Sequence, residues 1–215
     1  MQPAELPSGE HALVAILRGV EPGRVVGIAD VLCNAGIRII EVPLNSPDPF
    51  ASIAALAASR RPDCLIGAGT VLTMDQVRQT QEVGGRLVVS PNCDAEVIEG
   101  ALRLGMQVMP GFATATEAFT AIRAGATHLK LFPAVSYGPR HLQSLRAVLP
   151  AQVNVYPVGG IGAPDIAGWL AVGAAGFGFG SELFRPDYSL ADIERRARLL
   201  VTAFRAARAQ AARPQ

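Results

Sequence analysis

The feature that most constrains the fold is an alternation of short apolar segments with longer amphipathic segments along the chain. The short segments are mostly apolar and rich in β-branched residues, which is typical of parallel strands buried on both faces. The longer segments carry helix start signals at Thr73, at Asp94 and in the capping-box pair Thr114 and Glu117, and the last helix is expected at about residues 190–209. We predict strands at residues 13–17, 38–42, 64–68, 87–90, 107–109, 128–132, 153–158 and 176–180.

This alternation amounts to eight strand–helix units of roughly 20–28 residues each, which implies a parallel sheet in an α/β protein. Eight units in 215 residues fit a compact (β/α)8 barrel of the TIM type. A doubly wound open sheet is the alternative. Because no Pro/Ser-rich linker or low-complexity segment divides the chain, residues 1–215 are predicted to form one domain.

Composition excludes several classes of function. The net charge of +1 gives no electrostatic reason to bind nucleic acid or an anionic membrane. The apolar runs are too short to span a bilayer, and the first ten residues predict no signal peptide. Cys33, Cys64 and Cys93 are odd in number and dispersed, so we expect neither a disulfide framework nor a zinc site, and a cytoplasmic location.

Lys130 is the only lysine, whereas the other eighteen basic residues are arginines. It alternates with Leu129 and Leu131 in its strand, so the amine points into the barrel if the leucines face the helices. One interpretation is a structural ion pair with Glu41, which the alternation in its own strand also places inside. The other is a Schiff-base lysine whose pKa is lowered by burial, with Glu41 as the proton shuttle. Arginine could replace the ion pair but not the nucleophile, which favours the chemical interpretation.

Functional residues of a barrel gather at the carboxyl ends of its strands. Arg18 follows the first predicted strand, where it could clamp a carboxylate or a phosphate. Two Gly-rich loops, at residues 158–165 and 177–184, are predicted to open the seventh and eighth helices. Together they indicate a phosphate site built from backbone N–H groups.

No metal or cofactor is expected. His11, His128 and His141 lack the spacing of metal ligands, and no Walker loop or dinucleotide fingerprint is present. His128 alternates in phase with Lys130, but nothing in the sequence assigns a role to it.

Eight motifs in order, from about residue 13 to residue 184, together resemble the bacterial 2-keto-3-deoxy-6-phospho sugar-acid aldolases. They are LVAILRG, GIRIIEVPLNSP, LIGAGTVL, SPN, GFATATEA, LKLFPA, VGGI and GSELF. The resemblance implies a metal-free class I aldolase, usually a homotrimer, that releases pyruvate and D-glyceraldehyde 3-phosphate. It implies Lys130 as the Schiff-base lysine and Glu41 as the proton donor and acceptor. It further implies a set of substrate-binding residues, namely Arg18, Asn45, Thr70, Pro91, Val158, Gly159, Gly160, Gly180 and Ser181.

Two departures from the gluconate branch of this family concern the substrate. That branch typically reads EVTLRT where this chain reads EVPLNS, and it has Thr where this chain has Val158. Both features resemble the galactonate branch, whose substrate differs at C4, and the gluconate-derived epimer is the alternative substrate. More distant alternatives are a phosphosugar epimerase or isomerase barrel that uses Glu41 as a base, and a non-catalytic sugar-phosphate-binding barrel.

Overall fold

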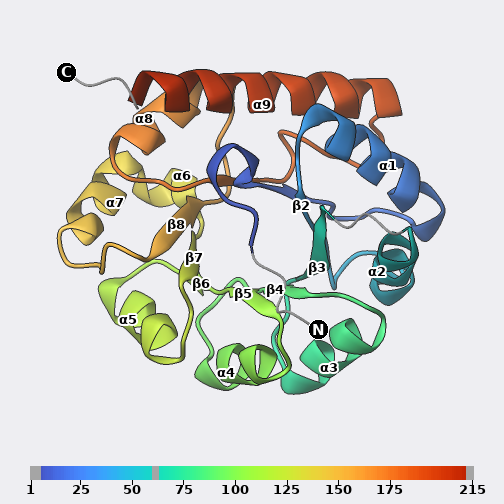
Figure 1. Cartoon of the computed structure of the whole chain (residues 1–215), viewed down its shortest axis with the longest axis horizontal. Coiled ribbons are helices and arrows are strands. Elements are labelled where there is room, and N and C mark those ends of the chain that lie inside the picture. Colours follow the sequence, from blue (N-terminus) through green and yellow to red (C-terminus); the bar gives the residue numbers. More distant parts are fainter. Residues whose placement is uncertain (1–5, 60–62, 212–215) are drawn as a thin grey trace.

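The computed structural model describes residues 6–59 and 63–211 of the chain. The described residues form a curled α/β arrangement in which helices surround parallel strands (Figure 1). The strands are β1 (Leu13–Ile16), β2 (Ile39–Pro43), β3 (Leu65–Gly69), β4 (Leu87–Val89), β5 (Gln107–Met109), β6 (Gly111–Phe112), β7 (His128–Leu131), β8 (Asn154–Pro157) and β9 (Phe177–Phe179).

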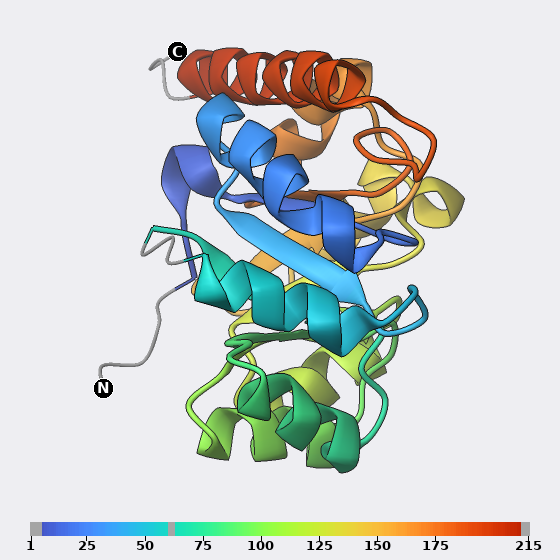
Figure 2. The same cartoon turned by 90° about the vertical axis from the view of Figure 1, so that its right-hand side faces the viewer.

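The helices lie outside the strands and cover them. The α-helices are α1 (Pro22–Ala35), α2 (Pro49–Ala58), α3 (Met74–Glu82), α4 (Ala95–Arg103), α5 (Ala115–Arg123), α6 (Ala134–Tyr137), α7 (Pro139–Arg146), α8 (Ile166–Ala171) and α9 (Leu190–Ala211). Two short 3-10 helices, η1 (Gly9–His11) and η2 (Ala163–Asp165), complete the set. The long α9 packs against both α1 and α8 (Figure 2). The last helix therefore lies next to the first helix, and the layer of helices closes around the strands.

The strands form two parallel sheets. Six strands lie in the order β5-β4-β3-β2-β1-β9 and make a half-barrel, and three lie in the order β6-β7-β8. The two sheets approach each other at two places, between β8 and β9 and between β5 and β6. A single parallel bridge joins Val158 to Gly178 at one end. At the other, β5 and β6 are consecutive in the chain and separated only by Pro110.

The predicted strands agree with the observed strands to within one residue at each boundary. The separate strand β6 was not predicted. Pro110 has no N–H to donate, so the ladder is interrupted there, although its carbonyl accepts a hydrogen bond from Lys130 N at 2.8 Å. The predicted caps are also observed: Thr73, Asp94 and Thr114 each accept a backbone hydrogen bond, and Thr114 and Glu117 form a full capping box.

One prediction about the loops is wrong. The loop at residues 158–165 leads into η2 and α8, as expected, but residues 181–184 form a turn and open no helix. The carbonyl of Gly180 accepts hydrogen bonds from the N–H groups of Leu183 and Phe184, both at 2.9 Å. Pro186 then disfavours helical backbone at Arg185. The start of α9 at Leu190 is marked by the Ser189 hydroxyl, which accepts a hydrogen bond from the N–H of Asp192 at 3.1 Å.

The cysteines are less dispersed in space than in sequence. Cys33 and Cys64 are buried, and their Sγ atoms lie 2.7 Å apart although 31 residues separate them. Cys93 is partly buried elsewhere. Among the described helices, none has both the length and the apolar character needed to cross a bilayer.

Candidate functional site

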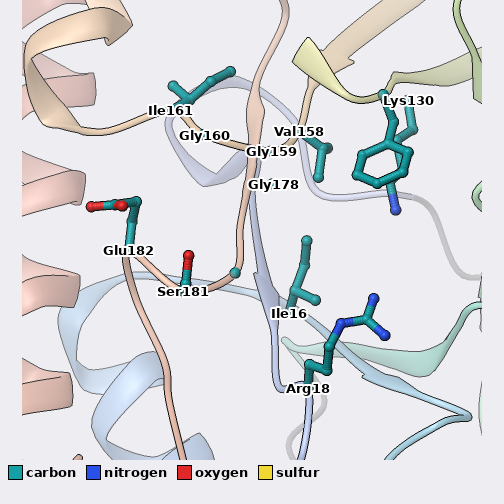
Figure 3. Close-up of a pocket in the computed structure, with 12 residues that line it drawn as sticks. Ile16, Arg18, Lys130, Val158, Gly159, Gly160, Ile161, Gly178, Ser181 and Glu182 are labelled. Atoms are coloured by element: carbon teal, nitrogen blue, oxygen red, sulfur yellow. The ribbon is translucent and has the colours of Figure 1, made fainter. Parts of the chain in front are cut away.

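A cavity of about 310 Å³ opens where several strands end. Its lining contains two basic side chains, Arg18 and Lys130, together with the backbone of two Gly-rich loops (Figure 3). In this view Arg18 and Lys130 extend into the cavity from one side, and Gly160, Ser181 and Glu182 lie on the other. The volume suits a small-molecule ligand. The lining residues are Ile16, Arg18, Lys130, Phe132, Val158, Gly159, Gly160, Ile161, Gly178, Gly180, Ser181 and Glu182.

The register of the sheets brings Lys130 and Glu41 to the inner face. Glu41 lies opposite Ile16 of β1, which lines the cavity, and neighbouring residues of paired strands point to the same face. Lys130 lies opposite Gly111 on one side and Tyr156 on the other. Leu129 and Leu131 are fully buried on the opposite face, as the alternation in the sequence predicts.

Lys130 is 5% exposed and packs among apolar atoms. Its Nζ lies 4.9 Å from the centroid of the Phe132 ring. Burial lowers the pKa of the Lys130 amine, the positive charge of Arg18 lowers it further, and the negative charge of Glu41 opposes both. The amine is therefore closer to its neutral, nucleophilic form than a surface lysine is.

Glu41 is 1% exposed, and among the described residues no hydrogen-bond donor reaches its Oε2 atom. Burial raises the pKa of the Glu41 carboxyl to about 7, against the opposing charges of Lys130 and Arg18. A carboxyl with a pKa near 7 can both take and give a proton at neutral pH. Burial therefore disfavours the charged form of both groups, because it lowers the pKa of Lys130 and raises the pKa of Glu41. Such opposed pKa shifts are expected of a site that performs proton transfer.

Arg18 is held by two uncharged groups. Its guanidinium donates hydrogen bonds to Oδ1 of Asn45 and, at 3.5 Å, to Oγ1 of Thr70. Thr70 adopts a left-handed backbone conformation with φ of 57° immediately after β3, which is uncommon for a β-branched residue and indicates a constrained site. Neither partner neutralises Arg18, so its charge remains available to an anionic ligand.

The glycine side of the cavity offers backbone donors. Within the described part of the chain, the N–H groups of Gly160 and Ser181 donate no hydrogen bond to another protein group. Gly159 and Gly160 have φ of 97° and 71°, and a β-carbon on Gly160 would collide with Val135. Glycine therefore allows a backbone path here that leaves donors for an anion.

Glu41 and the remaining predicted site residues are not among the residues that line the cavity. Asn45 and Thr70 contact Arg18 rather than the cavity itself, and Pro91 packs against Gly111, the strand neighbour of Lys130. His128 lies outside the lining, where its ring contacts the side chains of Thr127 and Asn154. Among residues 6–59 and 63–211, no group of three or more His, Cys, Asp or Glu side chains could hold a metal ion.

Sequence reasoning missed five lining residues. Ile16 and Phe132 could have been found, because they alternate in phase with Arg18 and Lys130 along their strands. Ile161, Gly178 and Glu182 lie within the two Gly-rich loops that the sequence predicted to bind phosphate. Nothing in the sequence singled them out individually, since their place in the lining depends on how the two loops approach each other.

The chain is similar to known aldolases. The sequence model described as KDPG and KHG aldolase matches residues 8–197. A probable 2-dehydro-3-deoxy-6-phosphogalactonate aldolase from Rhizobium meliloti is 46% identical, over 93% of this chain and 94% of that protein. The 2-dehydro-3-deoxy-6-phosphogalactonate aldolase of Escherichia coli is 44% identical, over 91% of this chain and 95% of that protein. A solved structure of native KDPGal superposes with a TM-score of 0.91 at 42% identity, covering 97% of this chain and all (100%) of that one.

Proposed function

The chain belongs to the KDPG and KHG aldolase family, and from this premise we propose that it is a class I aldolase acting on 2-dehydro-3-deoxy-6-phosphogalactonate. The reaction yields pyruvate and D-glyceraldehyde 3-phosphate, a carbon–carbon bond cleavage in D-galactonate catabolism. The observation that carries the proposal is the placement of the only lysine, buried in a cavity beside a carboxyl group whose pKa is raised to about 7. An aldolase that works through a Schiff base needs both groups.

Lys130 is the proposed nucleophile. Its neutral amine attacks the C2 ketone, and a C–N bond forms as the carbonyl oxygen becomes a hydroxyl. Glu41 supplies the proton with which that hydroxyl leaves as water, and an iminium remains. Burial supports this step because it favours the neutral amine over the ammonium.

The bond between C3 and C4 then breaks. Glu41, now a carboxylate, takes the proton of the C4 hydroxyl, and the electron pair of the C3–C4 bond moves into the iminium to give an enamine. The C4 to C6 fragment departs as glyceraldehyde 3-phosphate. Glu41 returns its proton to C3. Water then hydrolyses the resulting iminium to release pyruvate and the free amine, and the proton set free restores the Glu41 carboxyl group.

The two sides of the cavity suit the two ends of this substrate. The Arg18 guanidinium is the proposed partner of the keto-acid carboxylate, and Asn45 and Thr70 hold it in place. Gly159, Gly160, Gly180 and Ser181 are the proposed phosphate site, in which backbone N–H groups bind the anion. Val158 shapes the space around the reacting carbons, and Pro91 packs behind Gly111, the strand neighbour of Lys130.

The galactonate-derived substrate is favoured by the EVPLNSP motif and by Val158, and the two relatives above carry that name. The decisive experiment measures kcat/KM for pyruvate release from both C4 epimers of the phosphorylated keto acid. We expect the galactonate-derived epimer to have the higher value. A higher value for the gluconate-derived epimer would reassign the substrate, and no pyruvate from either would overturn the aldolase assignment.

We further propose a single domain, residues 1–215, closed into a (β/α)8 barrel. Support comes from the bridge between Val158 and Gly178 at one junction of the sheets. At the other junction, residues 107–112 pair with β4 through β5 and with β7 through β6. A homotrimer in the cytoplasm is the proposed assembly and location. Light scattering during gel filtration tests the trimer.

A further inference from the structure

The buried Glu41 carboxyl group has one oxygen atom, Oε2, that no described residue holds by a hydrogen bond. The side chain is 1% exposed, and Oε2 has no partner among the described residues. Leaving such an atom unpaired costs free energy, so a flexible glutamate would turn away unless its surroundings confined it. The charges of Lys130 and Arg18 attract the carboxylate, but no hydrogen bond from a described residue fixes the position of Oε2.

Gly69 provides that confinement. A β-carbon placed on Gly69 would come closer than 3.0 Å to all three terminal atoms of Glu41, namely Cδ, Oε1 and Oε2. Real β-carbons essentially never approach other atoms so closely. The carboxylate therefore occupies the volume that the side chain of any residue other than glycine would fill.

The backbone conformation of Gly69 does not itself require glycine. Gly69 is the last residue of β3 and is not among the glycines with positive φ, whereas the next residue, Thr70, has φ of 57°. Alanine could adopt the backbone conformation of Gly69 without strain. The space beside its Cα, rather than the freedom of its backbone, is what the site uses.

The strand around Gly69 is fixed on the side that faces β2. Gly69 lies opposite Pro43, and its carbonyl accepts a hydrogen bond from the N–H of Leu44 at 2.8 Å. Moving β3 away would break this pairing, whereas the end of a glutamate side chain can rotate. An added methyl group would therefore displace the Glu41 carboxylate rather than the strand.

We propose that Gly69 is a positioning residue that aims Glu41 at the substrate, because its missing β-carbon creates the slot in which the carboxylate lies. The proposal rests on the proposed function, in which Glu41 transfers the protons. Gly69 itself touches no reacting atom. Its effect on turnover passes through the place of the Glu41 carboxylate.

The test compares Gly69→Ala with Gly168→Ala, a control in α8 where a β-carbon would meet no atom within 4 Å. We expect Gly69→Ala to lower kcat by at least about tenfold. General acid–base catalysis contributes roughly 10²–10⁴-fold to the rate, and a misplaced carboxylate should lose part of that contribution. The limb of the kcat/KM pH profile near pH 7 should also shift. The control should change neither quantity. A folded Gly69→Ala enzyme with kcat within twofold of the wild type would overturn the proposal.

A double-mutant cycle with Glu41→Gln separates positioning from an independent effect. If Gly69 acts only through the carboxylate, Gly69→Ala should change kcat by less than twofold once Glu41→Gln has removed the proton shuttle. Equal fold-losses in the two backgrounds would show that Gly69 acts by another route and would overturn the proposal.

Thermal unfolding keeps the proposal testable if Gly69→Ala folds poorly. Gly69→Ala should lower the Tm of the wild type by more than it lowers the Tm of Glu41→Ala, because that background lacks the group that the new methyl would meet. Equal losses of Tm in the two backgrounds would overturn the proposal. This measurement does not depend on activity, so it remains decisive even if the wild type releases no pyruvate, a result that would sink the proposed function separately.

Discussion

Replacing Glu41 by glutamine should abolish most turnover and, at neutral to alkaline pH, stabilise the protein. Glutamine keeps the shape of the side chain but carries no charge and cannot take a proton from the C4 hydroxyl. General acid–base catalysis contributes roughly 10²–10⁴-fold, so we expect kcat to fall by that factor. The gain in stability follows from the burial of Glu41, which is 1% exposed with no hydrogen bond to Oε2.

The size of the gain follows from the pKa of Glu41. Folding raises that pKa from 4.5 to about 7, chiefly because burial disfavours the carboxylate. One pKa unit is worth about 1.4 kcal/mol, so the free energy of unfolding of the wild type contains a contribution of about 3 kcal/mol. This contribution is fully present below pH 4.5 and is lost as the pH rises through 7, because the unfolded chain loses its proton first.

The Glu41→Gln variant has no such loss, so its stability relative to the wild type should increase by up to about 3 kcal/mol between pH 4.5 and 8. The carboxylate also stabilises the charged form of Lys130, which offsets part of the gain wherever Lys130 is protonated. Urea unfolding followed by circular dichroism at both pH values measures the difference. Glu99→Gln is the matched control, since the Glu99 side chain is 52% exposed.

A stability difference that does not depend on pH would refute the burial of an unpaired carboxyl group at Glu41. Such a result would mean that the carboxyl group is solvated or paired in solution. Near-normal kcat in the folded variant would independently show that Glu41 is only a charge partner of Lys130.

The other predictions concern the covalent step, the metal and the substrate. Sodium borohydride with pyruvate should inactivate the enzyme and add one reduced pyruvyl group at Lys130, seen by intact mass and peptide mapping. Lys130→Arg should give no adduct. A reduced pyruvyl group on that variant would show that the adduct does not form at Lys130 and would disprove its role as the Schiff-base lysine. EDTA should leave kcat unchanged, because the iminium accepts the electron pair; strong inhibition would point to a metal. Val158→Thr adds a hydroxyl at a cavity position that is 4% exposed, and should raise kcat/KM for the gluconate-derived epimer relative to the galactonate-derived one. One hydrogen bond is worth about 0.5–1.5 kcal/mol, hence about two- to tenfold, and an unchanged ratio would remove Val158 from the specificity argument.

Local signals determined where the elements begin and end. The strand positions follow from runs of β-branched and apolar residues, and the caps at Thr73, Asp94 and Thr114 follow from side chains that bond to backbone within the next turn. Because side chains alternate along a strand, the sequence also indicated that Lys130 and Glu41 point inward. The absence of any other lysine singled out Lys130 for chemistry.

Only the tertiary structure decided what surrounds these residues. The turn at residues 181–184, the division of residues 107–112 into two strands and the approach of Cys33 to Cys64 depend on contacts between distant segments. Gly69 is the clearest case, since in the sequence it is one glycine of a GAGT motif, and only the register of β2 against β3 places it against Glu41. Alternation along one strand is a local property that a sequence displays. The alignment of neighbouring strands is fixed by the packing of the whole core, and it decides which side chains meet.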